Sequence, residues 1–316
     1  MQAYIIRRSL LIIPTLLLVT IMIFFSVRLI PGDVVKIMVA ESEFMTGKGV
    51  EAIRHELGLD VSIPVQYGRW ISGVVRGDLG NSLWSGQPVL EMLVSKLPVS
   101  FELGLLAIFV GLLIALPVGI YSAIRQDTGG DYVGRILAIA CIALPNFWLG
   151  TMVMVFPAIW WHWSPPMEYI SFIEDPIGNL QMFIVPSILL GMGMSGITMR
   201  MTRTMMLEVL RQDYIRTAWA KGLRERIVIF RHALKNALIP VVTIAGLQIP
   251  ILIGGSVVLE SIFNLPGMGR LLVVVIHQRD YTVISGINLI MSSVVLVTNL
   301  GVDLTYAFLD PRVLYK

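Results

Sequence analysis

The chain has 316 residues, of which 56% are hydrophobic and 14% are charged, whereas about a quarter of the residues of an ordinary soluble domain are charged. A soluble fold of this length could not bury so much apolar surface without exposing large patches, which argues against soluble enzymes, disordered regulators and secreted scaffolds. Cys141 is the only cysteine, so the chain can form neither an intrachain disulfide nor a cysteine-based metal cluster. The composition indicates a protein for which lipid is the main solvent.

Six long stretches of the sequence contain no Asp, Glu, Lys or Arg. Each is long enough to cross a hydrocarbon core, which takes about 20 residues of helix. Helices are expected because a spanning segment must satisfy its backbone polar groups internally, and the first stretch is too long for a cleaved signal. We therefore predict an all-α integral membrane protein with six transmembrane helices, within residues 9–27, 103–124, 136–167, 176–199, 236–259 and 281–302.

The distribution of basic residues indicates the orientation, because cytoplasmic loops carry an excess of Lys and Arg. If the N-terminus is inside, the inner segments hold 15 of the 24 basic residues, in 1–8, 124–135, 200–235 and 310–316. We therefore expect both termini to lie in the cytoplasm. Membrane topology then accounts for the net charge of +3, and we expect no nucleic-acid partner.

Two connecting segments are longer than simple turns require. Residues 31–100 form a mixed-charge extracytoplasmic segment, in which 49–60 predicts a short amphipathic helix closed by Gly58 and 88–97 predicts another. The other segment is the basic stretch 200–235.

The basic stretch predicts two helical parts. Residues 204–220 are mostly helix formers, and Gly222 stands where such a helix could end. A second helical part then leads to Pro240 at the start of the fifth span.

No catalytic pattern in the sequence is complete. An ATP-binding loop needs G-x-x-x-x-G-K-[ST], but Lys48 is followed by Gly49, and the four histidines form no H-E-x-x-H zinc motif. Ser195 fits the G-x-S pattern of an intramembrane protease, yet no histidine lies where it could serve as the base. We expect Ser195 and Cys141 to be packing residues, because small residues let membrane helices approach closely.

One motif in the basic segment resembles the coupling loop of ABC importer permeases, in the variant of dipeptide, oligopeptide and nickel permeases. Its residues are Asp213-Tyr214-Ile215-Arg216-Thr217-Ala218, then Gly222, and later Asn236-Ala237-Leu238-Ile239-Pro240. The general form has Glu-Ala-Ala where this chain has Arg216-Thr217-Ala218, a departure typical of the peptide subgroup. Other family motifs follow in order along nearly the whole chain, including Arg28-Leu29-Ile30-Pro31-Gly32-Asp33, Gly77-Asp78-Leu79-Gly80-Asn81-Ser82, Asn264-Leu265-Pro266-Gly267-Met268-Gly269 and Asp310-Pro311-Arg312.

The resemblance is strongest to the B-type permease of a dipeptide importer, and it implies a type I ABC importer fold in a bacterial inner membrane. It implies three kinds of partner besides membrane lipid: a paralogous C-type permease subunit, two ABC ATPase subunits and an extracytoplasmic substrate-binding protein. ATP and its Mg²⁺ would be bound by the ATPase partners, so this chain would hold no cofactor and would not itself be an enzyme. The implied organisation has four parts. Residues 1–30 are the N-terminus and the first helix, and residues 31–100 are the outer segment. Residues 95–309 are the permease core, and residues 310–316 are the cytoplasmic end.

The resemblance also implies the residues that would couple the permease to its ATPases, which are Asp213, Tyr214, Arg216, Thr217, Ala218, Trp219, Lys221 and Gly222. We expect Gly222 to permit a sharp exit and a close approach of backbones. Tyr214 and Trp219 would supply apolar anchoring, with Arg216 and Lys221 at the rim.

Several alternatives stay open at this point. The basic segment could be a solvated loop that only satisfies the positive-inside rule, and residues 31–100 could be a stabilising cap instead of a docking surface. The substrate could be a nickel chelate or glutathione. A stand-alone secondary transporter is an alternative from a different class. It is disfavoured because such proteins usually place charged or unwound elements at mid-membrane, whereas the six stretches of this chain contain no charged residue.

Overall fold

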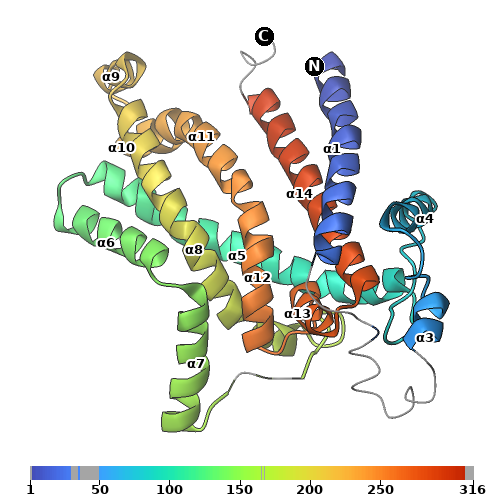
Figure 1. The fold of residues 1–316 in the computed structure, drawn as a ribbon. Helices are drawn as coiled ribbons and strands as arrows, with labels where there is room; N and C mark the ends of the chain where they lie inside the picture. The colour runs from blue at the N-terminus through green and yellow to red at the C-terminus, as the bar shows by residue number, and fades with distance from the viewer. Residues whose placement is uncertain (1, 30–34, 36–49, 165, 167, 310–316) are drawn as a thin grey trace. The chain divides into compact units, whose positions relative to one another are not determined.

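The computed structural model describes residues 2–29, 35, 50–164, 166 and 168–309. In these ranges the regular elements are helices, apart from one isolated bridge between Asn81 and Pro88. The prediction of an all-α chain is therefore confirmed (Figure 1). The predicted C-terminal segment 310–316 and the Pro31-Gly32-Asp33 motif lie outside the described residues.

Five of the described helices are long and apolar enough to cross a membrane, and a bent pair brings the number to six. The spans lie within Leu10–Arg28, Val89–Ile124, Pro176–Leu210, Glu225–Gly254 and Tyr281–Thr305, with the pair Gly129–Ala143 and Asn146–Trp161. Six spans agree with the charge-free stretches of the sequence.

The chain divides into two compact units. The larger unit contains residues 101–265, the first four residues and the C-terminal part from residue 298. The smaller unit contains residues 5–100 and 266–297.

The smaller unit is built from a long first helix, two short helices, parts of two long helices and one short apolar helix. These are α1 (Gln2–Arg28), α3 (Val50–Glu56), α4 (Ile63–Val75), the start of α5 (Val89–Ile124), α13 (Met268–Gln278) and the start of α14 (Tyr281–Leu309). Its main core gathers Val89 and Leu93 of α5 with Met268 of α13 and Ile287 of α14. A Cβ at Gly286 would lie 2.7 Å from Val89, so a glycine at this position lets α14 approach α5 closely.

A buried carboxylate organises the loop before α5 in this unit. Asp280 Oδ2 accepts hydrogen bonds from the Ser82 hydroxyl at 2.6 Å and from the Leu83 N–H at 3.1 Å. Its Oδ1 accepts from the Val283 N–H at 3.2 Å, at the start of α14. Asp280 thus joins two segments that are about 200 residues apart in sequence.

The larger unit is arranged around one long helix. Its elements are α6 (Gly129–Ala143), α7 (Asn146–Trp161), α8 (Pro176–Leu210), α9 (Asp213–Ala220), α10 (Glu225–Ile227), the π-helix η2 (Val228–Ala233), α11 (Leu234–Leu247) and α12 (Ile249–Ile262). A Cβ at Gly191 of α8 would lie 2.6 Å from the Ala107 carbonyl of α5, and one at Gly196 would lie 2.6 Å from the Ala138 carbonyl of α6. Small residues therefore bring α8 against both neighbours, as expected for membrane helices.

This packing confirms the interpretation of two residues that could have been nucleophiles. Ser195 is fully buried, and its hydroxyl donates to the Met192 carbonyl one turn earlier at 2.8 Å. Cys141 belongs to an apolar cluster with Ala115, Ala138 and Met199.

A buried ion pair adds a polar link between α6 and α8. Asp131 has no exposed surface, and Arg203 of α8 donates to it twice, from Nε to Oδ1 at 2.7 Å and from Nη2 to Oδ2 at 2.8 Å. Arg135, one turn along α6, donates to Oδ2 at 2.8 Å. The two-pronged geometry fixes the relative position of the two helices at this level.

The structure corrects the third predicted span, which is two helices and not one. The axes of α6 and α7 differ by 91°. The break falls at Leu144 and Pro145, where proline removes a backbone donor and restricts the residue before it to extended backbone.

Other boundaries differ as well. The predicted helix at 49–60 is present as α3, which ends at Glu56, two residues before Gly58 with its φ of +66°. The helix expected at 88–97 is the first part of the 36-residue α5. Residues 204–220 are not one helix, because α8 ends at Leu210 and α9 begins at Asp213. Helices α4 and α13 are not predicted from the sequence.

Candidate functional site

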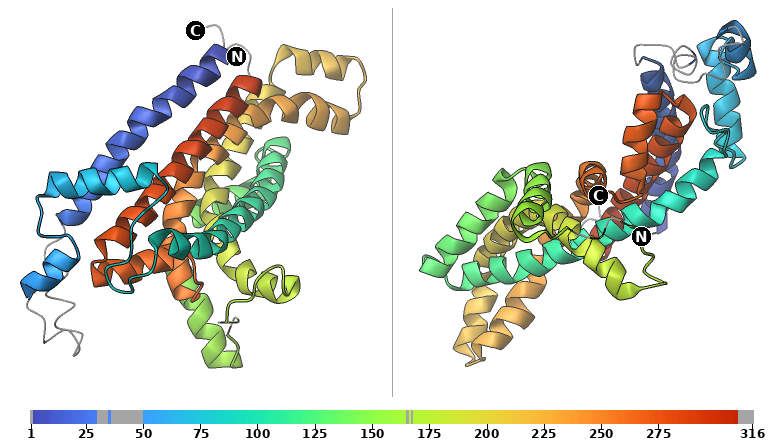
Figure 2. Two further views of the ribbon diagram at one scale, coloured as in Figure 1. Left: turned by 90° about the vertical axis from the view of Figure 1, so that its right-hand side faces the viewer. Right: turned by 90° about the horizontal axis from the view of Figure 1, so that it is seen from below.

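The candidate site is α9, a short helix that follows α8 after a two-residue break. The Gln212 carbonyl accepts hydrogen bonds from the N–H groups of Ile215 at 3.0 Å and Arg216 at 3.2 Å, which closes the first turn. Asp213 places a carboxylate in that turn, where it interacts favourably with the helix dipole. Figures 1 and 2 show α9 beyond the end of α8, beside the helix that η2 and α11 form.

One face of α9 is anchored in the larger unit. Ile215 is fully buried and Ala218, three residues later, is nearly so. Both belong to a hydrophobic cluster that includes Ala123 of α5, Met206 of α8 and Val228 of η2. This cluster joins α9 to two membrane helices through close packing.

Gly222 ends α9 with a specific hydrogen-bond pattern. Its φ is +74°, its N–H donates to the Trp219 carbonyl at 2.9 Å, and the Leu223 N–H donates to the Ala218 carbonyl at 3.4 Å. This is a Schellman motif, which requires a left-handed residue at the position of Gly222. The expected sharp exit is therefore present. A Cβ at Gly222 would meet nothing within 4 Å, so no part of the described chain makes the predicted close approach.

The rest of the surface of α9 is exposed and combines aromatic with charged side chains. Tyr214 and Trp219 each have 44% of their surface exposed. Arg216 and Lys221 lie near them, and Arg216 Nη1 makes only a 3.4 Å exposed ion pair with Asp213. Exposed aromatic side chains with a basic rim are typical of protein interfaces.

The exposed face continues on the following segment. Ile227 and Phe230 are exposed, and several exposed basic side chains surround them: Arg224, Arg226, Arg231 and Lys235. The Asn236 amide donates to the Tyr214 hydroxyl at 2.8 Å and holds this ring against the start of α11. A π-helix, the form taken by η2, occurs frequently at functional positions in helices.

The structure brings all eight predicted residues together at this site, but with different surroundings. Seven are exposed, namely Asp213, Tyr214, Arg216, Thr217, Trp219, Lys221 and Gly222. Ala218 is buried and faces the larger unit instead. Two important residues were not given roles from sequence: Ile215, which anchors α9, and Asn236, which fixes Tyr214. The three-residue spacing of Ile215 and Ala218 could have indicated the buried face.

Comparison with known families matches nearly the whole chain. Residues 115–315 match the family described as binding-protein-dependent transport system inner membrane component. Residues 1–104 match the N-terminal part of such membrane components.

Curated relatives match from end to end. The oligopeptide transport system permease protein AppB of Bacillus subtilis is 40% identical, with 100% of both chains covered. The dipeptide transport system permease protein DppB of Escherichia coli K12 is 37% identical, again with 100% of both chains covered.

The fold is also found among solved structures. The inward-facing MetNI methionine ABC transporter has a chain that superposes with a TM-score of 0.57, at 17% sequence identity. The match covers 70% of this chain and 97% of that one. The predicted fold, that of an ABC importer permease, is therefore confirmed.

Proposed function

The chain belongs to the family of binding-protein-dependent transport system inner membrane components, and from that premise we propose that it is the permease subunit of an ATP-driven peptide importer. Full-length relatives named for oligopeptide and dipeptide transport support small peptides as the substrate class. The chain then forms part of the translocation pathway, and partner subunits hydrolyse ATP.

The coupling element in this proposal is α9. The observation that carries it is the division of α9 into two faces, with Ile215 buried among the membrane helices and Trp219 exposed. A helix with one face held by the permease and the other accessible can seat in a groove of a soluble ATPase and move with it as one body. Tyr214 and Trp219 would enter the groove, and Arg216 and Lys221 would lie at its rim.

The partners follow from this arrangement. Two ABC ATPase subunits would meet α9 and its counterpart on a paralogous C-type permease subunit, and would bind ATP with Mg²⁺. A substrate-binding protein would dock on the opposite side of the membrane, where residues 31–100 are its proposed contact. The exposed basic side chains around α9 support a cytoplasmic location for this end, with both termini inside.

The coupling role is tested by two substitutions at Gly222 that separate backbone conformation from contact with a partner. Both Gly222→Ala and Gly222→Trp place a side chain on a residue with φ of +74°, so both strain the Schellman turn by a similar amount, about 1 kcal/mol. Inside the described chain there is free space around this position. Only an ATPase seated on α9 would therefore distinguish the indole from the methyl group.

The measurement is peptide uptake and peptide-stimulated ATP hydrolysis by the complete importer reconstituted in vesicles. We expect Gly222→Ala to retain most coupling, and Gly222→Trp to abolish uptake while the ATPase loses its dependence on substrate. Equal behaviour of the two variants would mean that the turn matters only for local folding. Wild-type uptake by Gly222→Trp would remove α9 from the coupling pathway.

A further inference from the structure

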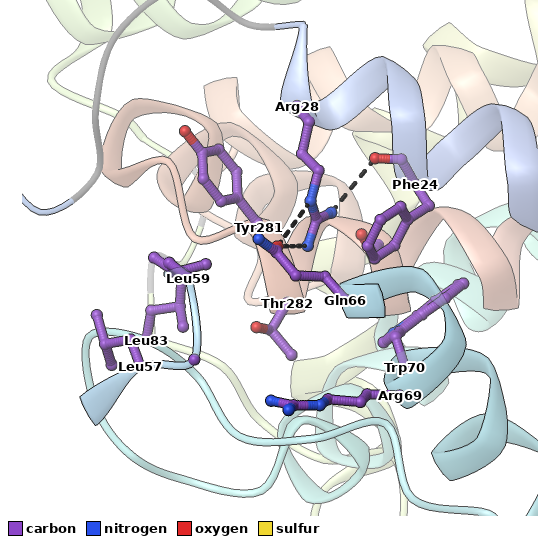
Figure 3. A pocket seen from close by; sticks show the side chains of 12 residues that line it. Phe24, Arg28, Leu57, Leu59, Gln66, Arg69, Trp70, Leu83, Tyr281 and Thr282 are labelled. Atoms are coloured by element: carbon purple, nitrogen blue, oxygen red, sulfur yellow. Dashed lines mark hydrogen bonds between the residues drawn. The ribbon is translucent and has the colours of Figure 1, made fainter. Parts of the chain in front are cut away.

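A pocket in the smaller unit has no role in the proposed coupling mechanism. Its volume is about 240 Å³, and it lies between the end of α1, helix α4, the turn after α3 and the start of α14. Figure 3 shows Arg28 of α1 and Arg69 of α4 on two sides of the pocket, with Thr282 of α14 between them in this view.

Arg28 brings a positive charge to the pocket that neutral groups hold in place. Its Nε and Nη2 donate to the Gln66 side-chain oxygen at 3.1 and 2.9 Å, and its Nη1 donates to the Phe24 carbonyl at 3.3 Å. A guanidinium group has five N–H donors, so two remain for a ligand. No carboxylate pairs with Arg28 within the described ranges of the chain.

Arg69 adds a second charge. Asp60 interacts electrostatically with Arg69, but its carboxylate is bound to His55, with 2.6 Å between Oδ2 and Nδ1. Arg69 therefore has no ion-pair partner in the described part of the chain, although its guanidinium lines the pocket. Two cations face one small cavity, and none of its lining residues is acidic.

The charge of the two arginines makes the pocket complementary to an oxyanion. Ser285 and Trp70 also line the pocket, but the Ser285 hydroxyl and the Trp70 indole Nε1 are buried and do not reach the cavity.

The surroundings of the pocket indicate where the oxyanion comes from. The apolar side chains of Leu18, Ile21 and Met22 are exposed along α1, which is a membrane span that ends at the pocket. Phe24 contacts both Tyr67 and Trp70, with ring centroids 5.3 and 5.6 Å apart. Clustered aromatic rings at the end of a span are typical of the level of lipid headgroups.

We propose that this pocket binds the phosphate of an anionic phospholipid headgroup. Arg28 and Arg69 contact the phosphate oxygens, and the acyl chains lie along the exposed side of α1. Arginine suits this role because its planar donors match phosphate geometry. The bound lipid fixes α4 against α1, since its phosphate contacts an arginine of each helix.

The test uses the full-length chain with its copurifying subunits, delipidated in a neutral detergent. Phosphatidylglycerol, a diacylglycerol with the same chains, and inorganic phosphate are each titrated, and bound lipid is counted by native mass spectrometry alongside the apparent unfolding temperature. We expect one tightly retained phosphatidylglycerol that raises the unfolding temperature. Diacylglycerol and millimolar phosphate should have no such effect.

Variants locate the bound lipid. Arg28→Gln and Arg69→Gln should each lower the affinity for phosphatidylglycerol about tenfold or more, because each removes a charge-assisted contact. The matched control is Arg76→Gln, at the end of α4 but outside the pocket. Arg69 is exposed, so its substitution tests the site even if Arg28→Gln fails to fold.

Three results would overturn the proposal. One is unchanged phosphatidylglycerol binding in the pocket variants. Another is an equal loss in Arg76→Gln, which would indicate diffuse attraction of lipid to a basic surface. Protection by inorganic phosphate as strong as that by phosphatidylglycerol would identify a site for free phosphate and not for lipid.

Discussion

Replacing Asp131 by asparagine keeps the shape of the side chain but removes the negative charge that Arg203 and Arg135 share. Breaking a buried ion pair costs about 3–5 kcal/mol, because the remaining charges lose their partner. The guanidinium groups of Arg203 and Arg135 are 21% and 37% exposed, so both can regain some hydration. We therefore expect a loss near the lower limit, about 3 kcal/mol, which corresponds to a fall of about 6 °C in the apparent unfolding midpoint.

The assay is thermal unfolding of the purified chain in detergent, followed by intrinsic fluorescence, for Asp131→Asn, Arg203→Gln and the double variant. If the two side chains act as one unit, the double variant should be barely less stable than either single one, with a coupling energy of about 3 kcal/mol. Effects of the single variants that add to within about 0.5 kcal/mol would refute the view that this pair holds α6 to α8.

Three further predictions concern packing, a buried carboxylate and topology. Gly196→Leu should destabilise the chain by about 1–3 kcal/mol in the same assay, since its Cβ would lie 2.6 Å from a backbone oxygen of α6, whereas Gly104→Leu, in open space, should change little. Asp280→Asn should lower the free energy of unfolding by about 2 kcal/mol, because it leaves one buried donor unpaired. The unfolding temperature measures this loss, and a midpoint equal to that of the wild type would contradict the prediction. Alkaline phosphatase fused after residue 90 should be active outside, and a fusion after residue 220 should be inactive; equal activity would contradict the six-span topology.

The six spans could be predicted from sequence because a lipid environment leaves long stretches without charge. The break in the third span could not be located this way, since α6 and α7 lie within one such stretch and only Pro145 marks the change of direction. Helix α4 is amphipathic but is not predicted, because it buries no residue completely and contains two glycines, which lower helix propensity.

The coupling residues were found as a motif, and their surroundings depend on contacts that a motif does not encode. The family motif places Ala218 among the coupling residues, yet in the structure Ala218 lies on the buried face that Ile215 anchors. Asn236 acts on Tyr214 across 22 residues, through a turn whose geometry the sequence indicated only by Gly222. The lipid pocket combines residues from α1, α4 and α14, so no local pattern could have revealed it.

The right angle between α6 and α7 has a mechanical consequence. Gly196 and Asp131 join α6 to α8, the helix that leads into α9, so we expect α6 to follow when α8 is displaced. A shift of α6 along its own axis would therefore push α7 in a direction perpendicular to the axis of α7. On α7, Gly150 leaves just enough room for Leu259 of α12, with 3.1 Å between that side chain and a Cβ built at the glycine. Helices α6 and α7 would therefore convert a movement along the axis of α6 into a lateral force on α12.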